Sequence, residues 1–411
     1  MPRADPAPLS SIPRGRALAY AASCYAVASV SFAPAVHASF LPVISRDFHL
    51  SLAQSSLYLS LNFWGALASV ILAGPIAGRV GSRRVLAATW LLEMLGVGAV
   101  GLAPHPMVAY AGVLLASLSF GAITVVVPHM VSAMEALRRG RAMSLLVSFY
   151  TLGAVASNLL VLLLFAAGAS WRAGYLLASA MGVPWGFLLF AASDALPPGG
   201  RPAPRHGGEE AQSEESVPRN RSSAAAFVAL CVAQLAGGGA EVSTSMWVPT
   251  FLSRENGAPE SLGPVSLLLF CVMGAVGKLA NAAATERVAP RLLNSAGFAL
   301  FAAGLVTAAL SADVATALVG FSLVGLGTGG FIPAVTVRMA ERFPNASASR
   351  YSVFMAVGNL GPVVGPILVA TVAAGDLRLG MLAMLPAAAI CFAIIASLGR
   401  RSAKARLHPG R

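Results

Sequence analysis

The sequence contains little charge. Asp, Glu, Lys and Arg make up 11% of its 411 residues, whereas a soluble domain typically contains about 25% of these residues. Hydrophobic residues make up 57%, and they gather in repeated stretches of about 20 residues, the length of a helix that crosses a hydrocarbon core of about 30 Å. Strand-length segments of alternating polarity do not occur, which argues against an outer-membrane barrel. The composition therefore predicts a helical integral membrane protein.

Cysteine is also scarce, and its placement excludes two kinds of site. The four cysteines all lie inside apolar stretches: Cys24, Cys231, Cys271 and Cys391. They resemble small hydrophobic residues rather than a disulfide framework or a zinc site, so we expect no metal and no cofactor. Met130 and Met134 stand beside His129 in a spacing that a soft metal such as copper could use. With 13 methionines in the chain, a packing stripe is the simpler interpretation.

Motifs for ATP-driven or enzymatic chemistry are missing. The sequence has no G-x4-G-K-[ST] phosphate loop, which a nucleotide-driven pump would need. It also offers no pairing of a nucleophile with a base. The segment GLGTGG at 325–330 lies within an apolar stretch, where small residues let helices pack closely. We therefore expect neither a primary pump nor an enzyme.

Twelve apolar stretches are expected to form membrane-spanning helices. Between the sixth and the seventh lies 193–223, a segment rich in Pro, Gly and charge that we expect to be a disordered cytoplasmic linker. The sequence thus predicts an all-α integral membrane protein with six-helix bundles at 17–192 and 224–398, an N-terminal tail at 1–16 and a basic C-terminal tail at 399–411. The expected spans are 17–43, 52–77, 84–103, 107–134, 141–166, 170–192, 224–252, 262–285, 290–310, 313–337, 350–373 and 377–398.

The charges that are present lie mostly on one side of the predicted membrane. Of the 28 Lys and Arg residues, 23 fall in the tails and loops on the side of the N-terminus. Lys278 lies within a span, and the other side holds Arg46, Arg172, Arg254 and Arg378. Because cytoplasmic loops carry the excess of Lys and Arg, both termini are expected in the cytoplasm. The net charge of +12 therefore does not call for a nucleic-acid partner, and the basic N-terminus lacks the h-region of a signal peptide.

The two halves of the sequence match each other at an offset of 207–208 residues. The matching pairs include Cys24 with Cys231, Pro42 with Pro249, Arg83 with Arg291 and Gly153 with Gly361. A nearly constant offset over the whole length predicts an internal repeat, so the two bundles should be related by pseudo-two-fold symmetry. Transporters built in this way bind substrate between the halves, near the bilayer midplane, and rock the halves to expose it to each side in turn.

Several segments resemble the major facilitator superfamily. The loop GPIAGRVGSRRVL at 74–86 is similar to the signature between that family's spans 2 and 3, with Gly78 in place of the usual aspartate. SWRAGY at 170–175 is similar to its W-R motif, and GNLGPVVGP at 358–366 resembles its Gly/Pro-rich helix 11. The resemblance covers nearly the whole chain and implies the fold of this family and secondary transport. GAEVSTSMWVPTFL at 239–252 is similar to the G-x-E segment of the fucose/glucose–proton symporter branch.

Glu241 is the principal candidate for proton coupling. It lies near the centre of the seventh span, where an ionised carboxylate costs about 2.5 kcal/mol or more. Three glycines precede it and permit close packing or local opening of the helix, while Ser245 offers a hydroxyl and Trp247 a stacking face for a ring or a sugar. We expect Glu241 to carry a proton or contact substrate. The alternative is a structural pair with Lys278, which could itself bind an anionic substrate group or snorkel toward the interface. A Lys–Glu pair could also couple substrate to proton, because an anionic substrate would compete with Glu241 for Lys278.

Other polar residues within the spans are candidates for the substrate cavity. His37 and His129 lie on helices that line the cavity in the resembled fold, and histidine titrates near neutral pH. A hydrogen-bonded packing histidine is the alternative for each. Asn359 is a further candidate, with a helix-packing hydrogen bond as its alternative. Glu93 is near the middle of the third span, which belongs to the outer scaffold in the resembled fold; we expect it to bridge to the second span or to be protonated.

The candidates for a cytoplasmic gate lie after the second span and at the end of the fourth: Arg79, Gly81, Arg83 and Glu135. Ion pairs there would stabilise an outward-open state, and charges that only fix the topology are the alternative. Because Gly78 stands where an aspartate is usual, Glu135 or Glu286 would have to supply the acidic partner.

The sequence favours a secondary active transporter, with proton-coupled symport of a small polar solute such as a sugar or an organic anion. Proton-driven efflux of drugs or metabolites stays open and predicts a mostly apolar, aromatic cavity. A non-transporting receptor or scaffold is the second alternative. The expected partners are the solute, protons and the lipid bilayer, and twelve spans suffice for a monomer. Arginine outnumbers lysine 26 to 2, which suggests a GC-rich bacterial genome and hence the bacterial inner membrane.

Overall fold

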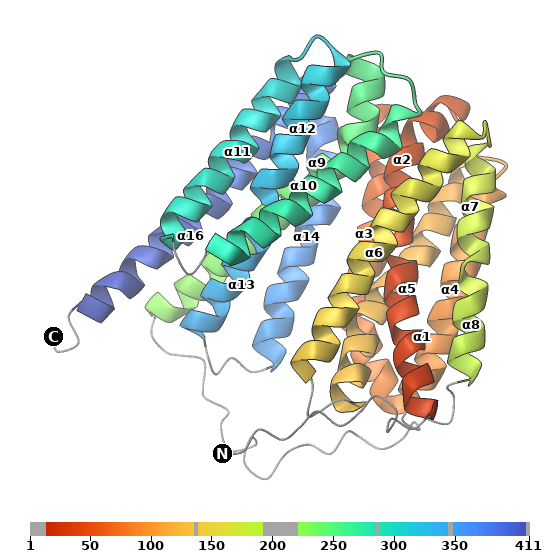
Figure 1. Ribbon diagram of the computed structural model, residues 1–411, viewed down its shortest axis with the longest axis horizontal. Coiled ribbons are helices and arrows are strands. Elements are labelled where there is room, and N and C mark those ends of the chain that lie inside the picture. The colour runs from red at the N-terminus through yellow and green to blue at the C-terminus, as the bar shows by residue number, and fades with distance from the viewer. Residues whose placement is uncertain (1–13, 135–138, 192–220, 285–287, 344–347, 408–411) are drawn as a thin grey trace.

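The computed structural model describes residues 14–134, 139–191, 221–284, 288–343 and 348–407 (Figure 1). All regular structure in these ranges is helical, so the predicted all-α class is confirmed. The first half contains α1 (Arg14–Val30), α2 (Phe32–Asp47), α3 (Leu52–Val80), α4 (Ser82–Gly101), α5 (Pro106–Met134), α6 (Arg139–Ala166), α7 (Trp171–Ala180) and α8 (Gly182–Ala191). The second half contains α9 (Arg221–Glu255), α10 (Leu262–Ala284), α11 (Pro290–Leu310), α12 (Val314–Thr328), α13 (Phe331–Arg342), α14 (Ala348–Ala373), α15 (Leu377–Leu382) and α16 (Met384–Leu407).

Each of the twelve predicted spans coincides with one helix or with two consecutive helices. Among the described residues, eleven helical stretches are long and apolar enough to cross a membrane, and a shorter apolar stretch, Leu152–Ala166, lies in the fifth predicted span. Two boundaries differ from expectation. The linker predicted at 193–223 lies almost wholly outside the described residues, and its last three residues already belong to α9; α16 continues through residue 407, well into the predicted C-terminal tail.

Four of the spans are interrupted once within the described residues, and a proline accounts for each interruption. The interruptions follow Val30, Ala180, Thr328 and Leu382, and the prolines four or five residues later are Pro34, Pro184, Pro333 and Pro386. A proline has no N–H to donate to the carbonyl four residues earlier, and its ring clashes with that carbonyl. Other prolines leave their helices continuous: Pro42, Pro75, Pro128, Pro249, Pro362 and Pro366.

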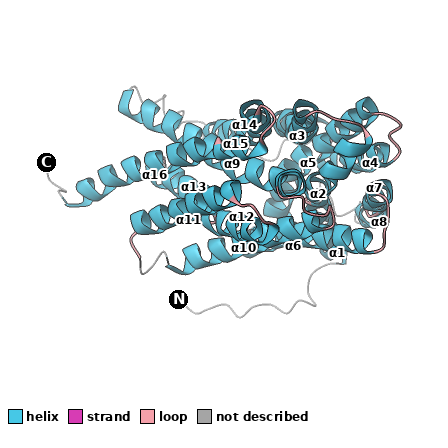
Figure 2. Ribbon diagram, turned by 90° about the horizontal axis from the view of Figure 1, so that it is seen from above, coloured by secondary structure: helices cyan, strands magenta, loops and turns pink. Residues whose placement is uncertain are grey.

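The helices form two groups that lie side by side. Figure 2 shows α1–α8 on one side and α9–α16 on the other, and the pairs that meet across the boundary include α2 with α9 and α10, α3 with α14 and α6 with α10. In Figure 1, α1 begins and α16 ends at the same end of the bundle, and the helices of the two groups spread apart toward that end. We call it the terminal end, and the opposite end, where the groups approach each other, the closed end.

The internal repeat predicted from the sequence is present in the helix packing. In the first half, α4 and α5 approach so closely that a Cβ at Gly96 would lie 2.7 Å from the carbonyl oxygen of Gly112. In the second half, α11 and α12 repeat this contact, because a Cβ at Gly320 would lie 2.7 Å from the carbonyl oxygen of Gly304. Gly304 and Gly320 lie 208 residues after Gly96 and Gly112. The same offset thus relates both the sequence and the three-dimensional contacts.

Arginines of the two halves also make equivalent contacts at the closed end. Arg172, at the start of α7, donates from Nη1 to the carbonyl oxygen of Ala103 at 2.5 Å. Arg378, at the start of α15, donates from Nη1 to the carbonyl oxygen of Ala309 at 3.0 Å, and its Nε lies 3.5 Å from the Glu255 carboxylate. Because guanidinium carries several donors in a fixed plane, each arginine ties the ends of neighbouring spans together. The W-R segment seen in the sequence is therefore part of the repeated scaffold.

Candidate functional site

Glu241 and Lys278 form an ion pair inside the second half. Lys278 Nζ on α10 lies 3.2 Å from Glu241 Oε1 on α9. The Glu241 side chain is 17% exposed and that of Lys278 is 50% exposed, so the carboxylate is largely covered while the ammonium is accessible. A charge within a span is costly unless it is paired. The structure therefore brings together the two intramembrane charges that the sequence singled out in this half.

A tyrosine of the first half lies within electrostatic range of this ion pair. Tyr150 on α6 interacts electrostatically with both Glu241 and Cys271, and α6 is the helix that packs against α10 across the boundary between the halves. The ion pair therefore lies at the boundary between the halves, where substrate binds in transporters built of two repeats. Sequence inspection missed Tyr150, since nothing in the SFYTLG segment around it distinguishes it from a packing aromatic.

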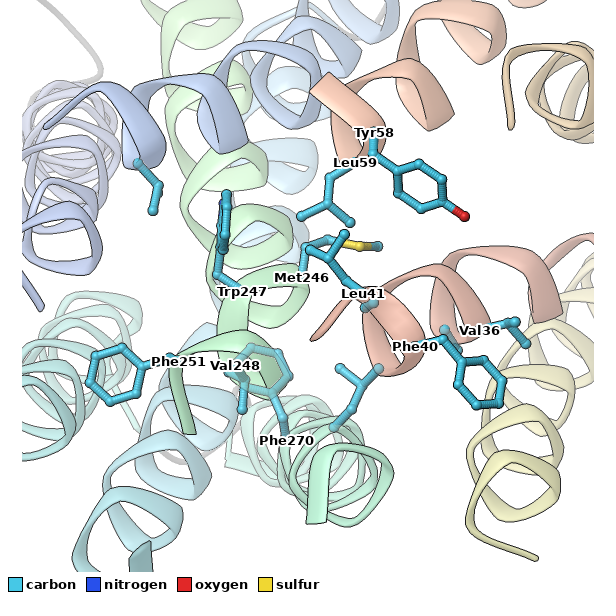
Figure 3. Packing of buried hydrophobic residues seen from close by; sticks show 14 of the residues in the cluster. Val36, Phe40, Leu41, Tyr58, Leu59, Met246, Trp247, Val248, Phe251 and Phe270 are labelled. Carbon is cyan, nitrogen blue, oxygen red and sulfur yellow. The ribbon is translucent and has the colours of Figure 1, made fainter. Parts of the chain in front are cut away.

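Trp247, which follows Glu241 on α9, is not exposed. Trp247 on α9 is fully buried, and its Nε1 has no hydrogen-bond partner among the described residues. Its neighbour Met246 points across the boundary toward Leu41 of α2 and Leu59 of α3, while Trp247 points away from that contact (Figure 3). Ser245 is partly buried and donates to the Val242 carbonyl at 2.8 Å. In this conformation Trp247 therefore packs within its own half and presents no free face to a solute.

His37 lies in a buried hydrogen-bonded cluster of the first half. Its Nδ1 is 2.7 Å from Tyr175 Oη and 3.2 Å from Tyr58 Oη, and the two tyrosine hydroxyls are 2.7 Å apart. All three side chains are fully buried, and His37 Nε2 has no partner among the described residues. The cluster ties α2, α3 and α7 together. His37 therefore does not line an open surface in this conformation.

The remaining cavity candidates, Asn359 and His129, lie on helices of different halves. Asn359 lies on α14 and is exposed. His129 lies on α5, but its side chain is outside the described part of the chain, as are the side-chain contacts of Met134. No group of three or more metal-binding side chains occurs among the described residues.

The gate candidates are only partly described. Gly81 joins α3 to α4 with φ of 93°, a left-handed conformation that favours glycine. Arg79 and Arg83 flank it and are exposed. Glu135 and Glu286 lie outside the described residues, so the ion pairs of the expected gate stay a prediction.

The Glu93 carboxylate accepts hydrogen bonds from helices other than the one that we expected. Ser29 Oγ of α1 donates to Glu93 Oε1 at 2.9 Å, and Ser119 Oγ of α5 donates to Glu93 Oε2 at 3.3 Å. Glu93 is buried on α4. The expected bridge to the second span is therefore wrong, because the carboxylate faces the first and fourth spans.

At the closed end, an ion pair and close backbone packing join the two halves. Arg46 Nη1, at the end of α2, lies 2.8 Å from Glu260 Oε1 in the loop before α10. Next to it, a Cβ at Gly263 would lie 3.4 Å from the Ser39 carbonyl oxygen. Opening this end would separate Arg46 from Glu260 and Met246 from Leu41.

Replacing Glu260 by Gln is expected to loosen the closed end only slightly. Arg46 is 66% exposed, and exposed ion pairs contribute about 0–1 kcal/mol, so the population with this end open should rise by no more than about fivefold. The readout is labelling of a cysteine placed at Ser266, which is buried in α10, by a membrane-impermeant maleimide. Glu341→Gln is the matched control, because Glu341 pairs with Arg338 inside α13. A rise in labelling well above about fivefold in Glu260→Gln, or an equal rise in Glu341→Gln, would contradict this expectation.

Comparisons with known proteins agree with this architecture. The family model of the Major Facilitator Superfamily matches residues 18–293 and 230–410. The comparison with curated proteins finds no match to the chain. Among solved structures, a point mutant of the nucleoside transporter NupG is similar with a TM-score of 0.72 and 13% identity, covering 93% of this chain and 99% of that one.

Two further solved structures show the same fold. A bacterial homologue of the human lysosomal transporter Spinster, in an inward-facing and unoccupied conformation, has a TM-score of 0.75 and 16% identity and covers 95% of this chain and 99% of that one. A D-xylose–proton symporter has a TM-score of 0.72 and 13% identity and covers 93% of this chain and 97% of that one. The resemblance seen in the sequence is confirmed, and the chain belongs to the Major Facilitator Superfamily of membrane transporters.

Proposed function

We propose that the protein is a secondary active transporter that couples the movement of a small polar solute to protons through the Glu241–Lys278 pair. The observation that carries the proposal is this pair: a carboxylate and an ammonium 3.2 Å apart within the spans, with Tyr150 of the other half in electrostatic interaction with the carboxylate. Each charge stabilises the charged form of the other residue. Removing one charge therefore makes the charged form of the other less favourable. A proton on Glu241 releases Lys278 from its partner.

The half-exposed ammonium of Lys278 favours a solute with an anionic group. A carboxylate or phosphate can take the place of Glu241 beside Lys278, because both present the same kind of oxygen acceptor to the ammonium. The freed Glu241 would then bind a proton more readily, since its cationic partner is occupied. Solute and proton would in this way bind together, which is the requirement for symport. The xylose–proton symporter among the structural neighbours supports proton-coupled symport on this fold, but its identity to this chain is too low to supply the solute.

The proposed topology places the terminal end in the cytoplasm. The excess of Lys and Arg in the tails and loops at that end, 23 residues against four, supports this orientation and a plasma-membrane location in a bacterium. The linker between the halves would then also be cytoplasmic. A monomer contains both halves and the whole Glu241–Lys278 pair, so the proposal needs no second copy.

The proposal is tested by proton flux into proteoliposomes that contain the purified protein. Sugars, organic acids, amino acids and cationic drugs are added singly to wild type and to Glu241→Gln, which keeps the shape of the side chain and removes its charge. We expect organic acids to trigger proton uptake in the wild type, with a loss of at least about tenfold in the variant, the size of a typical coupling between two ligands. Glu341→Gln on α13 is the control for an equal change of charge elsewhere.

The other outcomes decide between the remaining functions. Proton release triggered by cationic drugs would replace symport by efflux. Solute-triggered flux that survives in Glu241→Gln would remove Glu241 from the coupling mechanism. Absence of flux and of binding with every compound would favour the non-transporting receptor or scaffold.

A further inference from the structure

We propose that Glu93, together with Ser29 and Ser119, forms a second proton-binding site in the first half of the protein. Glu93 is buried at the middle of α4, and each of its two carboxylate oxygens accepts one serine hydroxyl, from α1 and from α5. The inference goes beyond the Glu241–Lys278 pair, since α9 and α10 contribute nothing to this site. Only its role in coupling rests on the proposed function.

The chemistry of the partners suits a group that changes its protonation state. A serine hydroxyl is both a donor and an acceptor. It can donate to a carboxylate, and after rotation it can accept the O–H of a carboxylic acid, so Glu93 keeps hydrogen bonds in either form. A site built to hold a permanent charge would instead supply a cation, because an unpaired charge in the membrane is costly.

No such cation is present among the described residues. The helices packed against α4 are α3, α5, α7 and α8, and no described Lys, Arg or His of these helices forms an ion pair with Glu93. The titratable group in electrostatic contact with it is Tyr25 of α1, whose hydroxyl donates to the Met181 carbonyl at 2.7 Å. Glu93 is therefore surrounded by neutral hydroxyls.

The internal repeat shows that this polar cluster is not part of the common scaffold. The positions in the second half that correspond to Glu93, Ser29 and Ser119 are occupied by Phe301, Ala236 and Gly327. Phe301 and Gly327 are in contact there, since a Cβ at Gly327 would lie 2.5 Å from the Phe301 backbone nitrogen. The same helix crossing is thus built without polar groups in one half and with a carboxylate and two hydroxyls in the other. Packing alone does not require the cluster.

Ser29 also lies beside the interruption of the first span. It is the last residue but one of α1, and the helix of the first span is interrupted between Val30 and Phe32. Discontinuous helices of transporters place ion and substrate sites at their breaks. A displacement of α1 relative to α2 would carry Ser29 away from Glu93 and change the hydrogen bonds of the carboxylate.

A hollow lies beside Ser29. It has a volume of about 190 Å³ and lies between α1, α6 and α7, with Ser29, Tyr25, Phe149 and Met181 among the residues that line it. Ser29 and Tyr25 are the residues with hydroxyl groups in its lining, which is otherwise apolar. Ser29 stands between this hollow and Glu93.

The test is pH-dependent infrared difference spectroscopy of the purified protein in lipid. Protonation of a buried carboxylate creates the carbonyl stretching band of a carboxylic acid, which a glutamine lacks. We expect a titrating band in the wild type that is absent in Glu93→Gln and retained in Glu241→Gln. Ser29→Ala should shift its frequency and midpoint, because it removes one hydrogen bond and keeps the carboxylate. Ser23→Ala on the same helix, where the hydroxyl donates to the Ala19 carbonyl, should leave the band unchanged.

The spectra separate this inference from the proposed function. If Glu93→Gln retains every titrating band, or if the Ser29→Ala spectrum equals that of the wild type, Glu93 is a structural carboxylate and the inference fails, whatever Glu241 does. Loss of the band in Glu93→Gln establishes the site even if no solute triggers proton flux. Where flux is found, Glu93→Gln should lower proton-driven solute accumulation by about tenfold while solute exchange at equal pH persists. A Glu93→Gln variant that fails to fold leaves the decision to the Ser29→Ala spectrum.

Discussion

Replacing Lys278 by Met is expected to lower proton-coupled transport by about 100-fold, the upper part of the range for coupling between two ligands. The substitution leaves Glu241 without a cation in the spans, where an unpaired carboxylate is costly. Glu241 would then hold its proton and no longer release it when solute leaves. The measurement is solute-triggered proton flux in proteoliposomes, alongside the thermal stability of the same preparation.

The double variant Lys278→Met/Glu241→Gln distinguishes a coupled pair from two independent residues. Removing both charges leaves neither unpaired, so the double variant should unfold at a higher temperature than Lys278→Met alone, although it still lacks the ammonium that would hold the anionic solute. A double-mutant cycle isolates this interaction, because residues in contact show non-additive effects. Strictly additive losses in the double variant would show that Glu241 and Lys278 act separately, and the mechanism proposed for them would be abandoned.

Much of the fold follows from the sequence, because membrane spans and internal repeats leave strong patterns. The twelve spans depend on apolar length alone, and the 208-residue offset places Gly304 and Gly320 opposite each other as Gly96 and Gly112 are. The interruptions of the spans could not be predicted in the same way. Pro34 breaks the first span while Pro42, eight residues later, does not; the local proline rule is the same for both, and tertiary packing decides whether the helix continues.

The candidate site was harder to predict than the spans. Glu241 and Lys278 stood out because charges inside spans are rare, and the pairing that we considered for them is present. His37 stood out because histidine titrates near neutral pH and its helix lines the cavity in the resembled fold, but it lies in a cluster with Tyr58 and Tyr175. Those partners are 21 and 138 residues away, and nothing in a single sequence shows which face of each helix meets another. Polarity within a span can therefore be read from the sequence, whereas exposure to a substrate path cannot.

Replacing Gly361 by Ala is expected to prevent most of the protein from folding or to lower its unfolding temperature strongly. A Cβ at Gly361 of α14 would overlap the Leu235 carbonyl oxygen of α9 and would lie 2.7 Å from the backbone nitrogen of Gly239. Both are backbone atoms of a long helix and cannot rotate away as a side chain would. Overpacking of this kind typically costs about 1–3 kcal/mol and more where the backbone itself must move. The measurement is the monodisperse yield in detergent and the thermal unfolding of what is recovered.

The crossing of α9 and α14 matters for function as well as folding, because Gly239 lies two residues before Glu241. A shift of α9 at this crossing would move the carboxylate relative to Lys278, so any Gly361→Ala protein that folds should also show weaker proton coupling. Gly74→Ala in α3 is the matched control, since a Cβ there meets nothing within 4 Å, and a helical Gly→Ala change without a clash is neutral or stabilising by about 0.5–1 kcal/mol. Gly153→Ala, the counterpart in the first half, should behave like Gly361→Ala because its Cβ would overlap the Ala28 carbonyl oxygen. Normal stability and coupling in Gly361→Ala would mean that α9 and α14 separate easily, and the position of Glu241 would then have to be fixed by Lys278 rather than by the glycine crossing.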